Sequence, residues 1–341
     1  MESSDMDRVV ALCPILDVAW GTPLTRAEGL GNQMAVLLEG EAVVEVDGLD
    51  VCSLGEESTV GELAVAGDHL RPLTVRANAP CRLMVVSEDA LATLREEGHP
   101  FAAEVERLAL VTLARVLLAL DRQLLQRHDL ATPEWPAERR PLRERLVALV
   151  GGAWAPSVEL DPQEVLTQCE LFEDLGEETL SVLGEQMTAL RYAAGHVVFM
   201  QGQLSGGVYV LVQGAVDAAV TTIDGEVKLL GSVGRGELFG VTSLVQGRPH
   251  AASCVTREAT TVLTMEADAW RRLVASDSEA SDGLRIASMR ALGRVLVRAR
   301  SALHHHLVVE RQLVVDEVAP LRAQGAVDVA KELGHVAYGE E

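Results

Sequence analysis

A glutamate and an arginine in residues 61–74 have the types and the spacing of an anion-binding site. The segment reads GELAVAGDHLRPLT, in which Arg71 follows Glu62 by nine positions and Thr74 comes three positions later. A glycine-led helical turn can direct free backbone N–H groups at one point, as anion-binding loops and helix N-termini do. The planar guanidinium of arginine stays charged at ordinary pH and donates two parallel hydrogen bonds. The segment therefore predicts a pocket for an oxyanion such as a phosphate.

Strands on both sides must position this pocket. Runs of apolar or alternating residues occupy positions 35–46 before the segment and 73–86 after it. Such runs are typical of strands, so the segment is expected to be a short helical insertion, with Arg71 closing on it from the next strand. The dipeptide Asp47-Gly48 predicts a tight hairpin between two of these strands. Many short strands at this spacing favour a β-sandwich or jelly roll over a parallel sheet.

The order and spacing of these residues are similar to the phosphate-binding cassette of cyclic nucleotide-binding domains. The resemblance implies that Glu62 binds the ribose 2′-hydroxyl and that Arg71 binds the cyclic phosphate. The ligand-binding positions that it implies are Gly61, Glu62, Leu63, Ala64, Arg71, Pro72 and Thr74, with backbone N–H donors at Gly61, Leu63 and Ala64. The implied ligand is cyclic AMP or cyclic GMP, and no other cofactor is implied. Pro72 departs from the family, in which a small or hydroxyl residue is commoner at this position.

The second half of the chain repeats the first. Ala193-Ala194-Gly195 matches Ala19-Trp20-Gly21, and residues 210–214 match residues 36–40 at the same offset. Similarity at one constant offset indicates a repeated structural unit. The resemblance then implies a mainly β fold with α-helices, in which two jelly-roll barrels are each followed by a long helix. The expected division is a first domain at 1–128, a linker at 129–161, a second domain at 162–313 and an acidic tail at 314–341.

The second copy of the cassette lacks both charged residues. Where the family has glutamate and arginine, this chain has Val241 and His250. Histidine has an ordinary pKa of about 6.5, and loss of one charged hydrogen bond costs about 1.5 to 3 kcal/mol. We therefore expect that the second site does not hold a cyclic nucleotide. The positions of this degenerate site are Gly240, Val241, Thr242 and His250. Arg248 is a candidate for a shifted replacement, but the following Pro249 indicates a turn at that point.

Helices are expected after each barrel. Ser87 predicts an N-cap for residues 90–97, and a long helix is expected at 102–126. The second copy has corresponding segments at 267–275 and 283–311. Apolar residues recur on both long helices at alternating intervals of three and four, which places one apolar seam on each helix. The seam residues are Leu110, Leu113, Leu117, Leu120 and Leu124 on the first helix, and Met289, Leu292, Leu296, Ala299 and Leu303 on the second. The two seams are expected to pack together within one chain, or to pair between chains in a homodimer.

Other segments are interpreted as structural. Residues 162–190 are expected to form a helical lead into the second barrel, and residues 142–150 a short helix within the linker. The basic cluster at 139–145 is interpreted as a solvated helix face. Three consecutive histidines at 304–306 would point in different directions on a helix, so they are interpreted as surface residues rather than as a metal site.

Composition limits the classes of function. The chain has 341 residues, enough for two domains, and a formal net charge of −22, which makes binding to nucleic acid unfavourable. No apolar run reaches the length of a membrane span and the first residues lack a signal-peptide pattern, so a cytoplasmic protein without a membrane partner is expected. The five cysteines are scattered, which predicts reduced thiols and neither a disulfide nor a zinc site. No catalytic signature is found, so an enzyme is not expected.

Two non-enzymatic functions remain. In the first, a cyclic nucleotide binds the first domain, and the seam helix repacks to signal to a partner protein. Phe101, Trp135 or Trp154 could then cover the base, although packing is the commoner use of such residues. In the second, the diverged domains form a scaffold that binds a peptide or protein at a sheet edge or groove, with a basic ligand favoured. An example is an accessory protein that presents a precursor peptide to a modifying enzyme. A structural interpretation of the cassette is that Glu62 and Arg71 pair only with each other.

Overall fold

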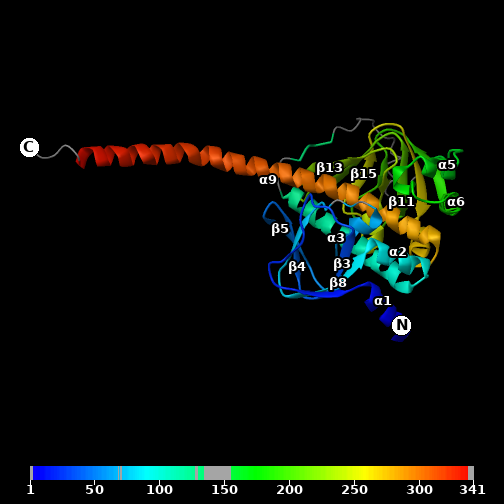
Figure 1. Ribbon diagram of the computed structural model, residues 1–341. Coiled ribbons are helices and arrows are strands. Elements are labelled where there is room, and N and C mark those ends of the chain that lie inside the picture. Colours follow the sequence, from blue (N-terminus) through cyan, green and yellow to red (C-terminus); the bar gives the residue numbers. More distant parts are fainter. Residues whose placement is uncertain (1–2, 68, 70, 127–129, 134–154, 337–341) are drawn as a thin grey trace, which may run out of the picture.

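Two β-barrels with surrounding helices make up the chain (Figure 1). The computed structural model describes residues 3–67, 69, 71–126, 130–133 and 155–336. The predicted linker helix at 142–150, the basic cluster at 139–145, Trp135 and Trp154 lie outside the described residues.

The first barrel has two four-stranded antiparallel sheets, with strand orders β1-β8-β3-β6 and β2-β7-β4-β5. Its elements are α1 (Ser3–Leu12), β1 (Ile15–Val18), β2 (Pro23–Thr25), β3 (Gln33–Glu39), β4 (Ala42–Val46), β5 (Leu49–Leu54), β6 (Thr59–Val60), the 3₁₀ helix η1 (Glu62–Ala66), β7 (Thr74–Ala77) and β8 (Cys81–Ser87). Asp47 and Gly48 join β4 to β5 with φ values of 51° and 84°, the left-handed backbone that a tight primed turn requires. The hairpin prediction is confirmed.

The second barrel has the equivalent sheets, with orders β14-β11-β16-β9 and β10-β15-β12-β13. Its elements are α5 (Pro162–Thr167), η2 (Glu170–Phe172), α6 (Glu177–Glu185), β9 (Met187–Tyr192), β10 (Val197–Phe199), β11 (Gly207–Gln213), β12 (Val216–Thr221), β13 (Val227–Val233), β14 (Leu238–Phe239), α7 (Val241–Gln246), β15 (Ser253–Thr256) and β16 (Thr260–Glu266). Gly40 and Gly214 occupy matching positions with φ values of 98° and 97°, and in each a Cβ would lie within 3 Å of a neighbouring backbone carbonyl oxygen. The internal duplication is therefore visible in the backbone as well as in the sequence.

Helices follow both barrels, as predicted. They are α2 (Glu88–Glu96), α3 (Pro100–Leu125), α8 (Ala267–Ala275) and α9 (Glu279–Val336). Ser87 caps α2, because its Oγ accepts a hydrogen bond of 3.1 Å from the Ala90 amide. Two predictions of helix bounds were wrong. The helical lead ends at Glu185 and not at Leu190, since residues from Met187 onward pair with β16, and α9 continues well past residue 311.

The seams of α3 and α9 pack against each other inside one chain. The two helices lie side by side between the barrels in Figure 1, and all ten predicted seam residues belong to one continuous buried core. A charged contact crosses the same interface, because Arg285 Nε of α9 donates to Glu106 Oε2 of α3 at 2.5 Å, and the two side chains are only 1% and 0% exposed. Because α9 covers the seam of α3, pairing of α3 with a second chain is not needed to bury that seam. Within the described residues, none of the helices combines the length and the apolar character that crossing a membrane requires.

Candidate ligand-binding site

The first cassette is a helical insertion between β6 and β7, as predicted. Gly61 begins it with a φ of 87°, and Gly67 ends η1 with a φ of 84°. A Cβ at Gly61 would stand 1.7 Å from Nη1 of Arg71, so the approach of the guanidinium requires glycine at this position. The chain is thus shaped locally to bring the arginine against the start of η1.

Glu62 is held inside the first barrel. Its side chain is 8% exposed, and its Oε1 accepts a hydrogen bond of 2.7 Å from the Thr59 hydroxyl. Burial raises the pKa of the Glu62 carboxyl, and this rise is opposed by the Thr59 hydrogen bond, the backbone amides of Glu62 and Gly61, and the charge of Arg71. The carboxyl therefore lies in an apolar setting, where it accepts a hydrogen bond from a hydroxyl group of the barrel.

Arg71 lies in the loop before β7 and not on the strand, so the predicted placement was wrong. Its backbone amide donates to the Gly29 carbonyl at 2.9 Å, and its carbonyl accepts from the Glu28 amide at 2.8 Å, which ties the cassette to the loop between β2 and β3. The guanidinium Nη2 donates to the Gln33 carbonyl, while Nη1 is buried and has no hydrogen-bond partner among the described residues. Burial lowers the pKa of Arg71, against the attraction of Glu62.

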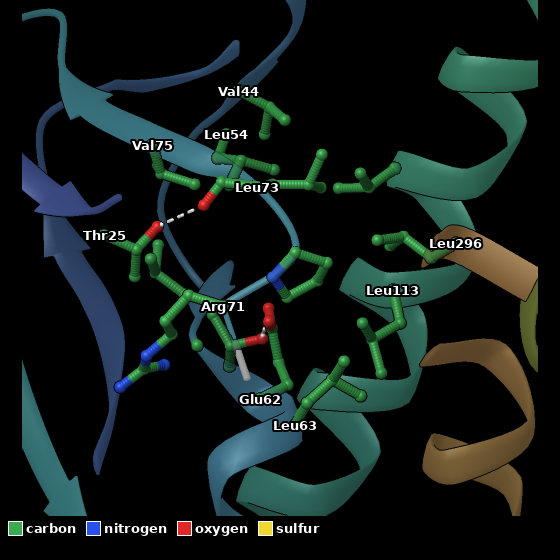
Figure 2. A pocket seen from close by; sticks show the side chains of 15 residues that line it. Thr25, Val44, Leu54, Glu62, Leu63, Arg71, Leu73, Val75, Leu113 and Leu296 are labelled. Atoms are coloured by element: carbon green, nitrogen blue, oxygen red, sulfur yellow. Dashed lines mark hydrogen bonds between the residues drawn. The ribbon is translucent and has the colours of Figure 1, made fainter. Parts of the chain in front are cut away.

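No ion pair joins Glu62 and Arg71 in the described part of the chain, where Glu62 bonds to Thr59 and Arg71 to Gln33, so the interpretation that the two residues pair only with each other was wrong. Figure 2 shows the Glu62 carboxyl beside the pocket, whereas the Arg71 guanidinium is directed away from Leu113 and Leu296. The two charged groups therefore point in different directions.

The pocket between these groups is small. Its cavity measures about 40 Å³, whereas pockets that hold small-molecule ligands are roughly 300 Å³ or larger. Leu113 and Val116 of α3 and Leu296 of α9 cover it, opposite the strands of the barrel. Phe101 packs against the barrel core and does not line the cavity. The contribution of Leu296 was not predicted, because it comes from the helix that follows the other barrel.

The remaining predicted residues of the first site either line the cavity or form hydrogen bonds within the protein. Leu63 and the Pro72 ring line the cavity, and proline has no amide N–H to donate. The Ala64 amide donates to the Gly61 carbonyl at 3.2 Å, and the Thr74 hydroxyl accepts from the Ala27 amide at 3.1 Å. In the closed arrangement these two groups therefore support the cassette itself.

The second cassette also begins with a left-handed glycine, but its helix is α and not 3₁₀, and its side chains differ. Gly240 has a φ of 87° and precedes α7, as Gly61 precedes η1. Val241 is buried, Thr242 follows it in the first turn of α7, and the ring of His250 stacks on Phe199 with centroids 3.8 Å apart. His250 Nδ1 lies 2.8 Å from the Ser243 hydroxyl, and burial lowers the pKa of His250 to about 4. The imidazole is therefore neutral at physiological pH.

Arg248 does not take the place of the missing arginine. Its side chain is exposed beyond the C-terminal end of α7 and lines an open groove of about 400 Å³ together with Leu204, Ser205 and Arg271. The turn expected before Pro249 is present, since Arg248 directly follows Gly247, which caps α7 in the left-handed conformation.

Three consecutive histidines lie on α9, and among the described residues no group of three or more His, Cys, Asp or Glu side chains has the arrangement of a metal site. His304 Nδ1 instead lies 2.5 Å from Asp47 Oδ2 at the β4–β5 turn. This contact joins α9 to the first barrel.

Paired barrels with a left-handed glycine and a short helix inserted between two strands define the chain as a tandem ligand-binding-domain protein. A family model described as "Cyclic nucleotide-binding domain" matches residues 17–97 and 189–277. The chain therefore belongs to the cyclic nucleotide-binding domain family and carries two such domains in tandem.

Relatives of this chain cover only parts of it. It is 27% identical over 140 residues to a "CRP-like cAMP-activated global transcriptional regulator" of Mycobacterium tuberculosis, a match that covers 41% of this chain and 61% of the relative. It is 24% identical over 170 residues to a "cAMP-dependent protein kinase regulatory subunit" of Dictyostelium discoideum, covering 50% of each. The chain thus spans about half to three fifths of these relatives. Among solved structures, the regulatory domain of Toxoplasma gondii PKA with cAMP aligns over 81% of this chain and 87% of that chain, with 16% identity and a TM-score of 0.32.

Proposed function

We propose that the protein is a non-enzymatic, cytoplasmic regulator whose first domain binds a cyclic nucleotide, cyclic AMP or cyclic GMP. The observation that carries the proposal is the buried Nη1 of Arg71, which has no partner and lies against Gly61 in an intact cassette. An unsatisfied buried donor on a charged group costs more than about 1 to 3 kcal/mol. A phosphate oxygen would supply the missing acceptor and match the guanidinium geometry.

The roles of the two charged residues follow from their positions. Arg71 would exchange its contact with the Gln33 carbonyl for the cyclic phosphate, and Glu62 would accept a hydrogen bond from the ribose 2′-hydroxyl. Relatives named as activated by or dependent on cAMP favour cyclic AMP over cyclic GMP as the first ligand to test.

The second domain would have no nucleotide of its own. Val241 offers no acceptor for a ribose hydroxyl, and the neutral ring of His250 offers no permanent charge for a phosphate. Where the first domain has an arginine, the second has the ring of His250, which is stacked on Phe199. This domain would instead act through the helix α9 and a partner protein.

Titration calorimetry with cyclic AMP and cyclic GMP tests the proposal. Wild type should give saturable heat, and Arg71→Ala should weaken binding by roughly tenfold or more, the effect of losing a charged hydrogen bond. Arg248→Ala is the matched control, because it removes an arginine at the second cassette that is exposed in the structure. Equal binding by wild type and Arg71→Ala, or no heat from either nucleotide, would contradict the proposal.

A second candidate function is a scaffold for an extended basic peptide, such as a precursor peptide presented to a modifying enzyme. The observation that favours it is the edge strand β13, whose Leu229 amide donates to the Ala131 carbonyl at 2.8 Å. A backbone carbonyl from outside the barrel thus already bonds to this edge, and edge strands are where peptides bind in strand addition. Binding of a basic peptide by a protein that ignores both nucleotides would favour this candidate.

A further inference from the structure

The helix after the second barrel contacts the cassette of the first. Leu63 of η1 packs onto α9 at Gly293, where a Cβ would lie 2.5 Å from Leu63 Cδ2. Three residues further along α9, Leu296 enters the lining of the first cavity. One face of α9 therefore covers both the cassette and the pocket that the cassette frames.

Arg290 fastens this contact at the end of the cassette. Its Nε donates at 2.7 Å to the carbonyl of Ala66, the last residue of η1. Its two other nitrogens reach the helical lead of the second barrel, with Nη2 at 2.5 Å from Asp174 Oδ2 and Nη1 at 3.5 Å from the Leu171 carbonyl. One side chain thus joins the first cassette to the lead of the second domain.

The covered pocket is too small for its proposed ligand. At about 40 Å³ it has room for water but not for a nucleotide, so at least one of its covering groups must move before a ligand enters: the cassette, Leu296 of α9, or Leu113 and Val116 of α3. If the cassette and α9 moved apart, the Arg290 bond to the Ala66 carbonyl or the packing of Leu63 on Gly293 would break. The closed pocket and the docked helix are consequently one state of the molecule.

We propose that α9 is an autoinhibitory lid on the first domain: its docking on η1 through Arg290, Gly293 and Leu296 excludes the ligand, and ligand binding displaces it. The inference rests on the proposed binding of a cyclic nucleotide in the first domain. Because coupling between two sites is reciprocal, a ligand that requires the undocked state shifts the population toward molecules in which α9 is released from η1, and a partner that holds α9 docked lowers ligand affinity. The apparent affinity equals the intrinsic affinity multiplied by the fraction of molecules in the open state.

Arg290→Ala and Arg294→Ala in the full chain form a matched pair for the test. Both arginines lie on α9 and pair with an acid of the second domain's lead, Arg294 with Glu170 at 3.0 Å, but only Arg290 also holds the cassette. Hydrogen exchange without ligand should be faster at residues 61–67 in Arg290→Ala than in Arg294→Ala. Cyclic AMP should bind Arg290→Ala about tenfold more tightly than it binds Arg294→Ala, within the range usual for coupled sites.

The two proposals fail in different ways. Equal exchange at residues 61–67 in the two variants, or faster exchange in Arg290→Ala without tighter nucleotide binding, overturns the lid while the binding proposal stands. If no variant and no wild-type sample binds either nucleotide, the binding proposal fails. The exchange difference then decides alone whether Arg290 keeps the cassette closed. Leu296→Ala, compared with Val297→Ala on the exposed side of α9, gives an independent second pair with the same expected order of affinities.

Discussion

Leu63 and Gly293 meet across the domain boundary so closely that a single added methyl group at position 293 would lie 2.5 Å from Leu63 Cδ2. The glycine therefore sits within a helix, where it is otherwise unfavourable, because the cassette of the other domain needs its space. The size of the side chain tolerated at position 293 thus depends on the side chain at position 63, although the two are far apart in the sequence.

Gly293→Ala is expected to destabilise the protein by about 1 to 3 kcal/mol, the usual effect of overpacking, as measured by urea denaturation. In a Leu63→Ala background the same change should stabilise by up to about 1 kcal/mol, since alanine favours a helix and the clash is gone. If the stability changes of the two substitutions were simply additive, the contact between Leu63 and Gly293 would be contradicted.

Glu106→Gln is expected to cost about 1.5 to 3 kcal/mol in the free energy of unfolding, because it removes the charge of one of the two carboxylates that pair with the buried Arg285, the other being Asp282. Arg95 also loses its partner, since its Nε lies 2.5 Å from Glu106 Oε1. Glu104→Gln, on the same helix, is the control: its pair with Arg107 is exposed, so its effect should stay within about 0.5 kcal/mol. Similar losses of unfolding free energy in both variants would show that the buried Glu106 contacts stabilise the protein no more than an exposed ion pair does.

Stability should fall as the pH drops from about 6.5 to about 4, in part because of His250. Burial lowers the pKa of this residue to about 4 from its ordinary 6.5, so in this window the unfolded chain binds a proton that the folded chain does not. The effect is on the order of 3 kcal/mol once the pH is below the folded pKa. Denaturation across this range should be less pH-dependent in His250→Phe and unchanged in His305→Gln, which alters an exposed histidine. An unaltered slope in His250→Phe would contradict the assignment.

Glu62→Gln should remove the preference for a ribose 2′-hydroxyl. Wild type is expected to bind cyclic AMP roughly tenfold or more tightly than 2′-deoxy cyclic AMP, because a charged hydrogen bond is lost with the hydroxyl. Glu62→Gln should bind the two ligands more nearly alike, which calorimetry measures directly. If the wild-type discrimination persists in the variant, another residue recognises the hydroxyl.

Local signals in the sequence predicted most of the fold. Asp47-Gly48, Ser87 and the seam residues specify a turn, a cap and two helix faces through their immediate neighbours, and each of these predictions is confirmed. The cassette was also located correctly between strands. Its proposed ligand contacts stay predictions.

Contacts between the domains could not be predicted in the same way. Nothing near Leu296 in the sequence indicates that it lines the pocket around Glu62, because that depends on how two long helices cross. The direction of the Arg71 guanidinium likewise depends on Gly31 and Gln33, which lie before the cassette on another loop and strand. Gly293 within an apolar seam was the one available signal of a close approach.

The single core shared by α3 and α9 has a consequence for dissecting this protein. A fragment that stops before α9 would leave the apolar face of α3 bare and the first pocket without its roof, so it should aggregate rather than report on ligand affinity. Because the two barrels share this core, a destabilising substitution in one is expected to lower the stability of the other as well.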